Sequence, residues 1–144
     1  MFNGKALVKS QVAEKEAYIL HSSYIFSGLS LEENISLATN LDSVRMNRVI
    51  EETNLVHLKE QVLRASNLSG GEKQRIEIAR SLYHQKAFIL ADEVKSNLDC
   101  KNAQLIEDIL FSVPQTVIEV IHHYSDENLS RYDHVINLSK ENTT

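Results

Sequence analysis

The spacing of apolar residues along this chain predicts two amphipathic helices separated by short strands. One helical pattern runs from Glu72 to Tyr83 and a second from Asn102 to Phe111, with apolar residues three and four positions apart. Continuous apolar runs, typical of buried strands, lie between and after these helices. The runs are 88–91, 116–121 and 135–138. A helix between consecutive strands suits the return path of a parallel sheet, so the pattern predicts an α/β domain.

The first of these helices should pack through one face. Its apolar positions are Ile76, Ala79, Leu82 and Tyr83. The polar positions Arg75, Glu77 and Arg80 are predicted to lie off that face.

The start of the same helix predicts a phosphate-binding site. It is formed by Leu68, Ser69, Gly70, Gly71 and Glu72. The first N–H groups of a helix have no partner inside it, and the helix dipole places partial positive charge there, which favours an anion. The glycines let a phosphate approach the backbone, and the serine hydroxyl adds a donor. A lone Ser-Gly-Gly is also common at an ordinary helix cap.

Carboxylates and histidines follow the predicted strands. Asp92 and Glu93 come directly after the first apolar run, and His122 and His123 come directly after the second. Each observation is weak alone, because polar residues often occupy solvated loops at strand ends.

The uninterrupted string from Leu68 to Arg75 is far more specific, and it resembles the signature sequence of the ATP-binding cassette (ABC) ATPases. Other motifs of that family follow in the expected order. Residues 92–93 resemble the end of its Walker B strand, and residues 96–99 resemble its D-loop. His122 falls at the position of its switch histidine.

The upstream part of the chain resembles the same family. Residues 18–28 are similar to its Q-loop segment, and residues 33–35 to the start of its helical subdomain. The sequence of residues 26–28, Phe-Ser-Gly, is most similar to that of exporter-type cassettes. His21 stands where the family has the glutamine that binds magnesium; imidazole can still serve as a ligand, although it prefers softer metals. The sequence also departs from the family pattern after Glu93. Val94 stands where the family usually has a proline or an alanine, and Lys95 stands where it usually has a threonine.

The resemblance implies a P-loop NTPase-like α/β fold, an incomplete parallel sheet with helices and a short helical subdomain. We therefore expect one partial ABC ATPase domain over residues 1–144. Residues 1–21 would form N-terminal strands leading to the Q-loop-like segment, and residues 22–68 the helical subdomain. Residues 69–144 would form the core that carries the signature, Walker B, D-loop and switch histidine.

The resemblance also implies roles for particular residues, with ATP and Mg²⁺ as cofactors. Asp92 would hold the metal, generally through water. The catalytic residues would be Glu93, which activates the attacking water, and His122, which contacts the γ-phosphate. The nucleotide-binding residues would be Ser69, Gly70, Gly71, Glu72, Asp99 and His21.

The phosphate loop of the family, G-x-x-x-x-G-K-[ST], does not occur in this sequence. The glycines are Gly4, Gly28, Gly70 and Gly71, and the only Gly-Lys pair is followed by Ala6. Residues 2–8 resemble the hairpin that follows the phosphate-loop helix in cassettes better than they resemble the phosphate loop itself. We therefore expect a fragment or truncated product that corresponds to about two thirds of a cassette. This chain alone should bind Mg-ATP weakly and show no turnover.

Composition agrees with one soluble α/β domain. The chain has 144 residues, 42% of them hydrophobic, and a net charge of −5 with scattered basic residues, so no nucleic acid is expected as a partner. The single cysteine, Cys100, cannot form an internal disulfide, which suits a reducing cytoplasm. No apolar run is long enough to cross a membrane. The resemblance implies a cytoplasmic location, peripheral on the inner face of the cell membrane through a transporter partner.

Together these features predict an ATP-binding, ATP-hydrolysing subunit or domain of an ABC transporter. Its partners would be a second ABC nucleotide-binding domain, in a head-to-tail dimer, and a transmembrane transporter domain. Two alternatives remain open at this stage. One is a soluble ABC ATPase of DNA maintenance, and the other is a non-catalytic, degenerate cassette that acts as an interaction protein.

Overall fold

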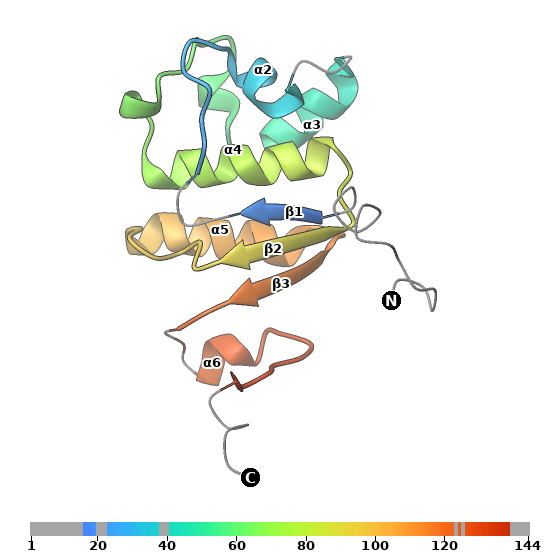
Figure 1. Cartoon of the computed structure of the whole chain (residues 1–144), viewed down its shortest axis with the longest axis vertical. Helices are drawn as coiled ribbons and strands as arrows, with labels where there is room; N and C mark the ends of the chain where they lie inside the picture. Colours follow the sequence, from blue (N-terminus) through green and yellow to red (C-terminus); the bar gives the residue numbers. More distant parts are fainter. Residues whose placement is uncertain (1–15, 20–22, 38–40, 123, 125, 139–144) are drawn as a thin grey trace.

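A three-stranded parallel sheet lies at the centre of the computed structural model, which describes residues 16–19, 23–37, 41–122, 124 and 126–138 (Figure 1). The strands are β1 (Glu16–Ile19), β2 (Phe88–Asp92) and β3 (Thr116–Val120), in the order β1-β2-β3. In register, Asp92 pairs with Val120 across β2 and β3. The predicted strands 88–91 and 116–121 are therefore confirmed to within one residue at one end.

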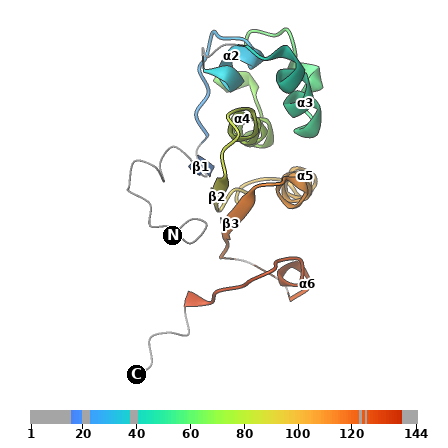
Figure 2. The ribbon, with the colours of Figure 1, turned by 90° about the vertical axis from the view of Figure 1, so that its right-hand side faces the viewer.

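The helices form layers on this sheet. They are α2 (Leu31–Ser36), α3 (Ser43–Glu52), α4 (Gly70–Tyr83), α5 (Cys100–Ser112) and α6 (Asp126–Leu129), with short 3₁₀ turns η1 (Val56–Leu58) and η2 (Ala65–Asn67). α5 lies along one face of the sheet, and α4 lies between β1 and the layer of α2 and α3 (Figure 2). No helix among the described residues is long and apolar enough to cross a membrane.

One continuous apolar core joins these layers. Ile76 and Ala79 of α4 are completely buried, as the helical spacing predicts, together with Ile89 of β2 and Ile106 of α5. On its other side α4 packs against α2 and α3, whose Ile35 is also fully buried. Each fully buried isoleucine contributes roughly 1.5–3 kcal/mol through burial. Because α4 packs against α2 and α3 on one side and against β1 and α5 on the other, it holds the two layers together.

Short-range caps fix where the main helices begin. Ser30, Asp42, Ser69 and Asp99 each accept a hydrogen bond from the backbone N–H three residues later. Ser30 and Ser69 form full capping boxes with a glutamate. Because the Ser69 cap satisfies the first turn, α4 begins at Gly70 rather than at the predicted Glu72.

The predicted strand at 135–138 is wrong. This segment is not a strand, and Val135, Ile136 and Leu138 are 55%, 79% and 76% exposed. A strand needs a neighbour that pairs with its N–H and C=O groups, and no described strand pairs with the outer edge of β3. An apolar, β-branched run without such a neighbour has no reason to extend as a strand.

The outer edge of the sheet exposes apolar side chains. Ile118 is 51% exposed and Val120 is 47% exposed. They alternate along β3 with Glu119, whose carboxylate pairs with Lys95 beside Glu107 of α5, so they lie on the face of the sheet away from α5. Within the described residues β3 is an edge strand of the sheet, and its outer backbone groups are not paired in it. A flat apolar edge of this kind is a template for pairing with another chain.

We therefore expect the 144-residue chain to self-associate through β3. Ile118→Lys should lower the average mass measured by light scattering and reduce the binding of a hydrophobic dye, because a lysine on an edge strand opposes edge-to-edge pairing. Val44→Lys is the matched control, since Val44 is 82% exposed on α3 but not on the sheet. A monodisperse unaltered chain with little dye binding and cooperative unfolding would contradict this prediction.

Candidate functional site

The carboxyl ends of β2 and β3 bring two of the predicted site residues into contact. Glu93 follows the last residue of β2, and His122 follows β3 by two positions. His122 Nε2 lies 2.9 Å from Glu93 Oε1, and the two side chains are 67% and 42% exposed. The pair is therefore open to solvent.

The backbone around Glu93 fixes the position of its carboxylate. Its N–H donates to the carbonyl of Val120 at 3.1 Å, and its own carbonyl accepts from the N–H and hydroxyl of Ser96. Glu93 has a φ of +47°, a left-handed conformation that costs a non-glycine residue roughly 1 kcal/mol or more. The completely buried side chain of Val94 anchors the turn in the core.

Asp92 ends β2 with an exposed side chain, beside this pair. In the described part of the chain, no three His, Cys, Asp or Glu side chains converge into a metal-binding cluster. Asp92 can therefore supply one hard oxygen ligand, which suits Mg²⁺, an ion that usually keeps several waters and few protein ligands. His21, the other predicted metal contact, lies outside the described residues.

At the start of α4 the Ser69 hydroxyl is already engaged. It accepts from the N–H of Glu72 at 3.2 Å and donates to Glu72 Oε2 at 2.8 Å. The N–H of Ser69 donates to the same carboxylate oxygen. A phosphate at this end would therefore meet the exposed Gly70 backbone and a hydroxyl shared with Glu72, rather than the free donor that the sequence suggests.

A histidine that sequence reasoning missed completes this end of α4. His57, from η1, places Nε2 2.8 Å from Glu72 Oε1. Burial alone would raise the pKa of Glu72, but the hydrogen bonds from His57 and Ser69 outweigh it and lower that pKa below its ordinary value. No local motif could have revealed His57, because it is not a helical neighbour of Glu72 and only the fold of the intervening segment brings them together.

The two signature glycines allow close packing inside the chain itself. A Cβ on Gly71 would lie 2.8 Å from Asn102 Oδ1, and one on Gly70 would lie 3.1 Å from a methyl group of Leu98. Asn102 Oδ1 also accepts from Arg75 Nη1 at 3.1 Å. Arg75 is only 4% exposed, so the prediction that it lies off the packed face is wrong. The hydrogen bond to Asn102 of α5 satisfies one nitrogen of the buried guanidinium, while Nε has no hydrogen-bond partner among the described residues. Burial lowers the pKa of Arg75.

Asp99, the last residue of the D-loop-like segment, caps α5. Its carboxylate accepts from the side-chain amide of Asn102 at 2.6 Å and from the Asn102 N–H at 3.0 Å. These hydrogen bonds lower the pKa of Asp99. Asn102 thus contacts Asp99, Arg75 and the position of Gly71, so the D-loop-like segment and the signature lie against each other.

Comparisons with known proteins identify the family of this chain. A family model described as "ABC transporter" matches residues 1–96. "ABC transporter G family member 8" of Arabidopsis thaliana is 34% identical over 155 residues, 96% of this chain and 26% of that protein. "Lipoprotein-releasing system ATP-binding protein LolD" of Treponema denticola is 36% identical over 117 residues, 74% of this chain and 50% of that protein.

A third relative is "Lactococcin-A transport/processing ATP-binding protein LcnC" of Lactococcus lactis. It is 32% identical over 142 residues, 92% of this chain and 20% of that protein. The chain belongs to the ABC transporter family, and its α/β core is a partial P-loop NTPase-like fold of that family. It spans between about a fifth and a half of the length of these three relatives.

We expect the two glycines to differ in their tolerance of a methyl group. Gly71→Ala should lower the free energy of unfolding by about 1–3 kcal/mol, because the new Cβ displaces Asn102 from buried Arg75. Gly70→Ala should cost less than about 1 kcal/mol, since a single methyl of Leu98 can move. Urea unfolding of both variants checks this, and equal midpoints would contradict the packing described here.

Proposed function

We propose that this chain is part of the ATP-binding unit of an ABC transporter, most similar to the exporter type, and that it helps to bind and hydrolyse ATP. The observation that carries the proposal is the 2.9 Å contact between Glu93 and His122 at the carboxyl ends of adjacent parallel strands. Ligand sites of α/β sheets lie at this edge. The names of the relatives, which are ATP-binding proteins of transport systems, support the same role.

In this proposal Glu93 polarises or deprotonates the attacking water. Its carboxylate is half-open to solvent, while its backbone is fixed by Val120 and Ser96, so it can hold a water in one orientation. His122, which contacts Glu93, would also contact that water and the γ-phosphate. Asp92 would contribute to holding Mg²⁺, which supplies charge neutralisation at the phosphates.

The signature end of α4 would serve a second ABC nucleotide-binding domain. Gly70, Gly71 and the capped Ser69–Glu72 pair would contact the γ-phosphate of ATP held by that partner, in a head-to-tail dimer. The exposed start of a 14-residue helix supports this assignment. Asp99 would link the two sites across such a dimer, and its contact with the signature through Asn102 supports this role.

We propose a domain organisation that follows the layers of the fold. We assign residues 22–68 to a helical subdomain, because α2 and α3 lie on the side of α4 away from the sheet. Residues 69–144 would form the catalytic core. A transmembrane transporter domain would be the further partner and would hold the assembly at the inner face of the membrane.

In a complete cassette that also supplies a phosphate loop, Glu93→Gln should lower the ATP turnover number by about 100-fold or more, the usual effect of removing a general base. ATP-dependent dimerisation should persist, because glutamine keeps the shape of the side chain. Glu51→Gln, on the exposed face of α3, is the matched control. Near-normal turnover of Glu93→Gln would remove Glu93 from the mechanism.

The histidine can be tested in the same assay. His122→Ala should impair turnover strongly because His122 contacts Glu93, whereas we expect His123→Ala to impair it much less. The reverse result would place the functional histidine one residue later than we propose.

Substitution of Gly70 by a bulky residue tests the signature face. Gly70→Leu should leave the chain folded, since Gly70 is exposed, but it should prevent ATP-dependent dimerisation with a partner cassette because the side chain fills the space of the phosphate. Glu51→Leu should dimerise normally. Sedimentation with and without Mg-ATP measures this, and an undiminished Gly70→Leu dimer would refute the proposed contact.

A further inference from the structure

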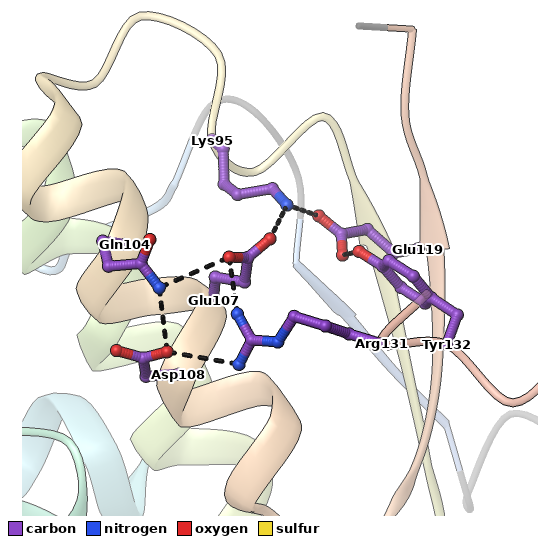
Figure 3. A network of polar contacts seen from close by, with 7 residues as sticks. All are labelled: Lys95, Gln104, Glu107, Asp108, Glu119, Arg131 and Tyr132. Atoms are coloured by element: carbon purple, nitrogen blue, oxygen red, sulfur yellow. Dashed lines mark hydrogen bonds and ion pairs between the residues drawn. The ribbon is translucent and has the colours of Figure 1, made fainter. Parts of the chain in front are cut away.

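A network of charged and polar side chains joins the turn after β2, helix α5, strand β3 and the segment that follows α6 (Figure 3). Its members are Lys95, Gln104, Glu107, Asp108, Glu119, Arg131 and Tyr132. None of the family motifs considered above includes this network, and Lys95 occupies a position where the sequence departs from the family pattern.

Lys95 is the only member that comes from the turn carrying Glu93. Its Nζ lies 3.0 Å from Glu107 Oε1 and 3.1 Å from Glu119 Oε1, the latter an ion pair rather than a well-directed hydrogen bond. Those two side chains are only 6% and 2% exposed. Burial alone would lower the pKa of Lys95, but the two carboxylates outweigh it and raise that pKa, so the ammonium stays charged.

The carboxylates that receive Lys95 are themselves held in place. Arg131 Nη1 donates to Glu107 Oε2 at 2.8 Å, and the Tyr132 hydroxyl donates to Glu119 Oε2. The Arg131 guanidinium lies 4.2 Å over the ring of Phe111. Since the second oxygen of each carboxylate is occupied, Lys95 meets two fixed acceptors rather than two mobile side chains.

These contacts connect the two segments that carry the proposed catalytic pair. Lys95 lies two residues after Glu93, and Glu119 lies three residues before His122. The hydrogen bond from the Glu93 N–H to the Val120 carbonyl is a first tie between the same segments. The Lys95–Glu119 ion pair is a second tie on the α5 side of the sheet.

We infer that Lys95 is a positioning residue, which holds the turn bearing Glu93 against the strand bearing His122 and so maintains the contact between those two side chains. Its effect on hydrolysis rests on the proposed function; its effect on the turn does not. The left-handed φ of Glu93 disfavours this turn conformation, and the ion pair supplies compensating stabilisation. Breaking a buried pair leaves a carboxylate without its partner, which is costly.

The experiment measures amide hydrogen exchange in the 144-residue chain. Lys95→Met keeps the length of the apolar stem and removes the charge, and it should speed exchange of the Glu93 N–H by about tenfold relative to the Ile76 N–H in α4. Lys95→Arg should restore slow exchange, because a guanidinium can also reach two carboxylates. Lys101→Met, which removes an exposed charge at the start of α5, is the matched control and should change nothing.

A second variant keeps the inference falsifiable if Lys95→Met does not fold. Glu119→Gln retains an acceptor for Tyr132 but removes the charge that attracts Lys95, so it should also speed exchange at Glu93. The double variant Lys95→Met/Glu119→Gln should exceed neither single variant by much, because both act through one contact. Unchanged Glu93 exchange in a folded variant, or additive effects in the double variant, would overturn the inference.

Kinetics separate this inference from the proposed function. In a complete cassette, Lys95→Met should lower kcat with little change in the KM for ATP, and Lys95→Arg should recover it, because Lys95 acts on the orientation of Glu93 and not on nucleotide binding. Normal turnover of Glu93→Gln would refute the catalytic role of Glu93, while faster exchange of the Glu93 N–H in Lys95→Met would still support the positioning role of Lys95. Slow exchange of the Glu93 N–H in Lys95→Met, together with an inactive Glu93→Gln, would refute only the positioning role.

Discussion

The parallel pairing of β2 with β3 is the interaction on which the candidate site depends. Because Asp92 pairs with Val120, the first residue after β2 can donate its N–H to the Val120 carbonyl, and the residues that follow β3 emerge beside it. A change of register by one residue would send these side chains to the opposite face of the sheet. The contact between Glu93 and His122 is therefore a consequence of strand register, reinforced by the buried Val94 and by Lys95.

At the start of α4, Asn102 connects the signature with the D-loop-like segment. It contacts the Asp99 carboxylate and buried Arg75, and its side chain lies where a Cβ on Gly71 would be. Glycine is therefore needed at the two signature positions for two different physical reasons. Gly71 is required for packing within the chain, whereas Gly70 is exposed and leaves its backbone open to a ligand. The same motif thus combines a structural constraint with the proposed phosphate contact.

Helices α4 and α5 and strands β2 and β3 could be predicted from sequence because their determinants are local. Apolar spacing located α4 and α5, and the caps of Ser69 and Asp99 act over only three residues. The proposed catalytic residues were also found locally, at the ends of apolar runs. That Glu93 and His122 touch could not be read in this way, since it depends on two strands being neighbours.

Sequence by itself determined the class of fold, the family and the order of the motifs, because those follow from periodicity and from short strings of residues. Tertiary structure decided which polar groups are buried and which apolar runs find a partner. Arg75 is buried because Asn102 reaches it from another helix, and residues 135–138 do not form a strand because no described strand pairs with the outer edge of β3. The contact of His57 with Glu72 and that of Lys95 with Glu119 likewise join segments distant in sequence. Burial and pairing of this kind are properties of neighbours in space, which a linear pattern does not contain.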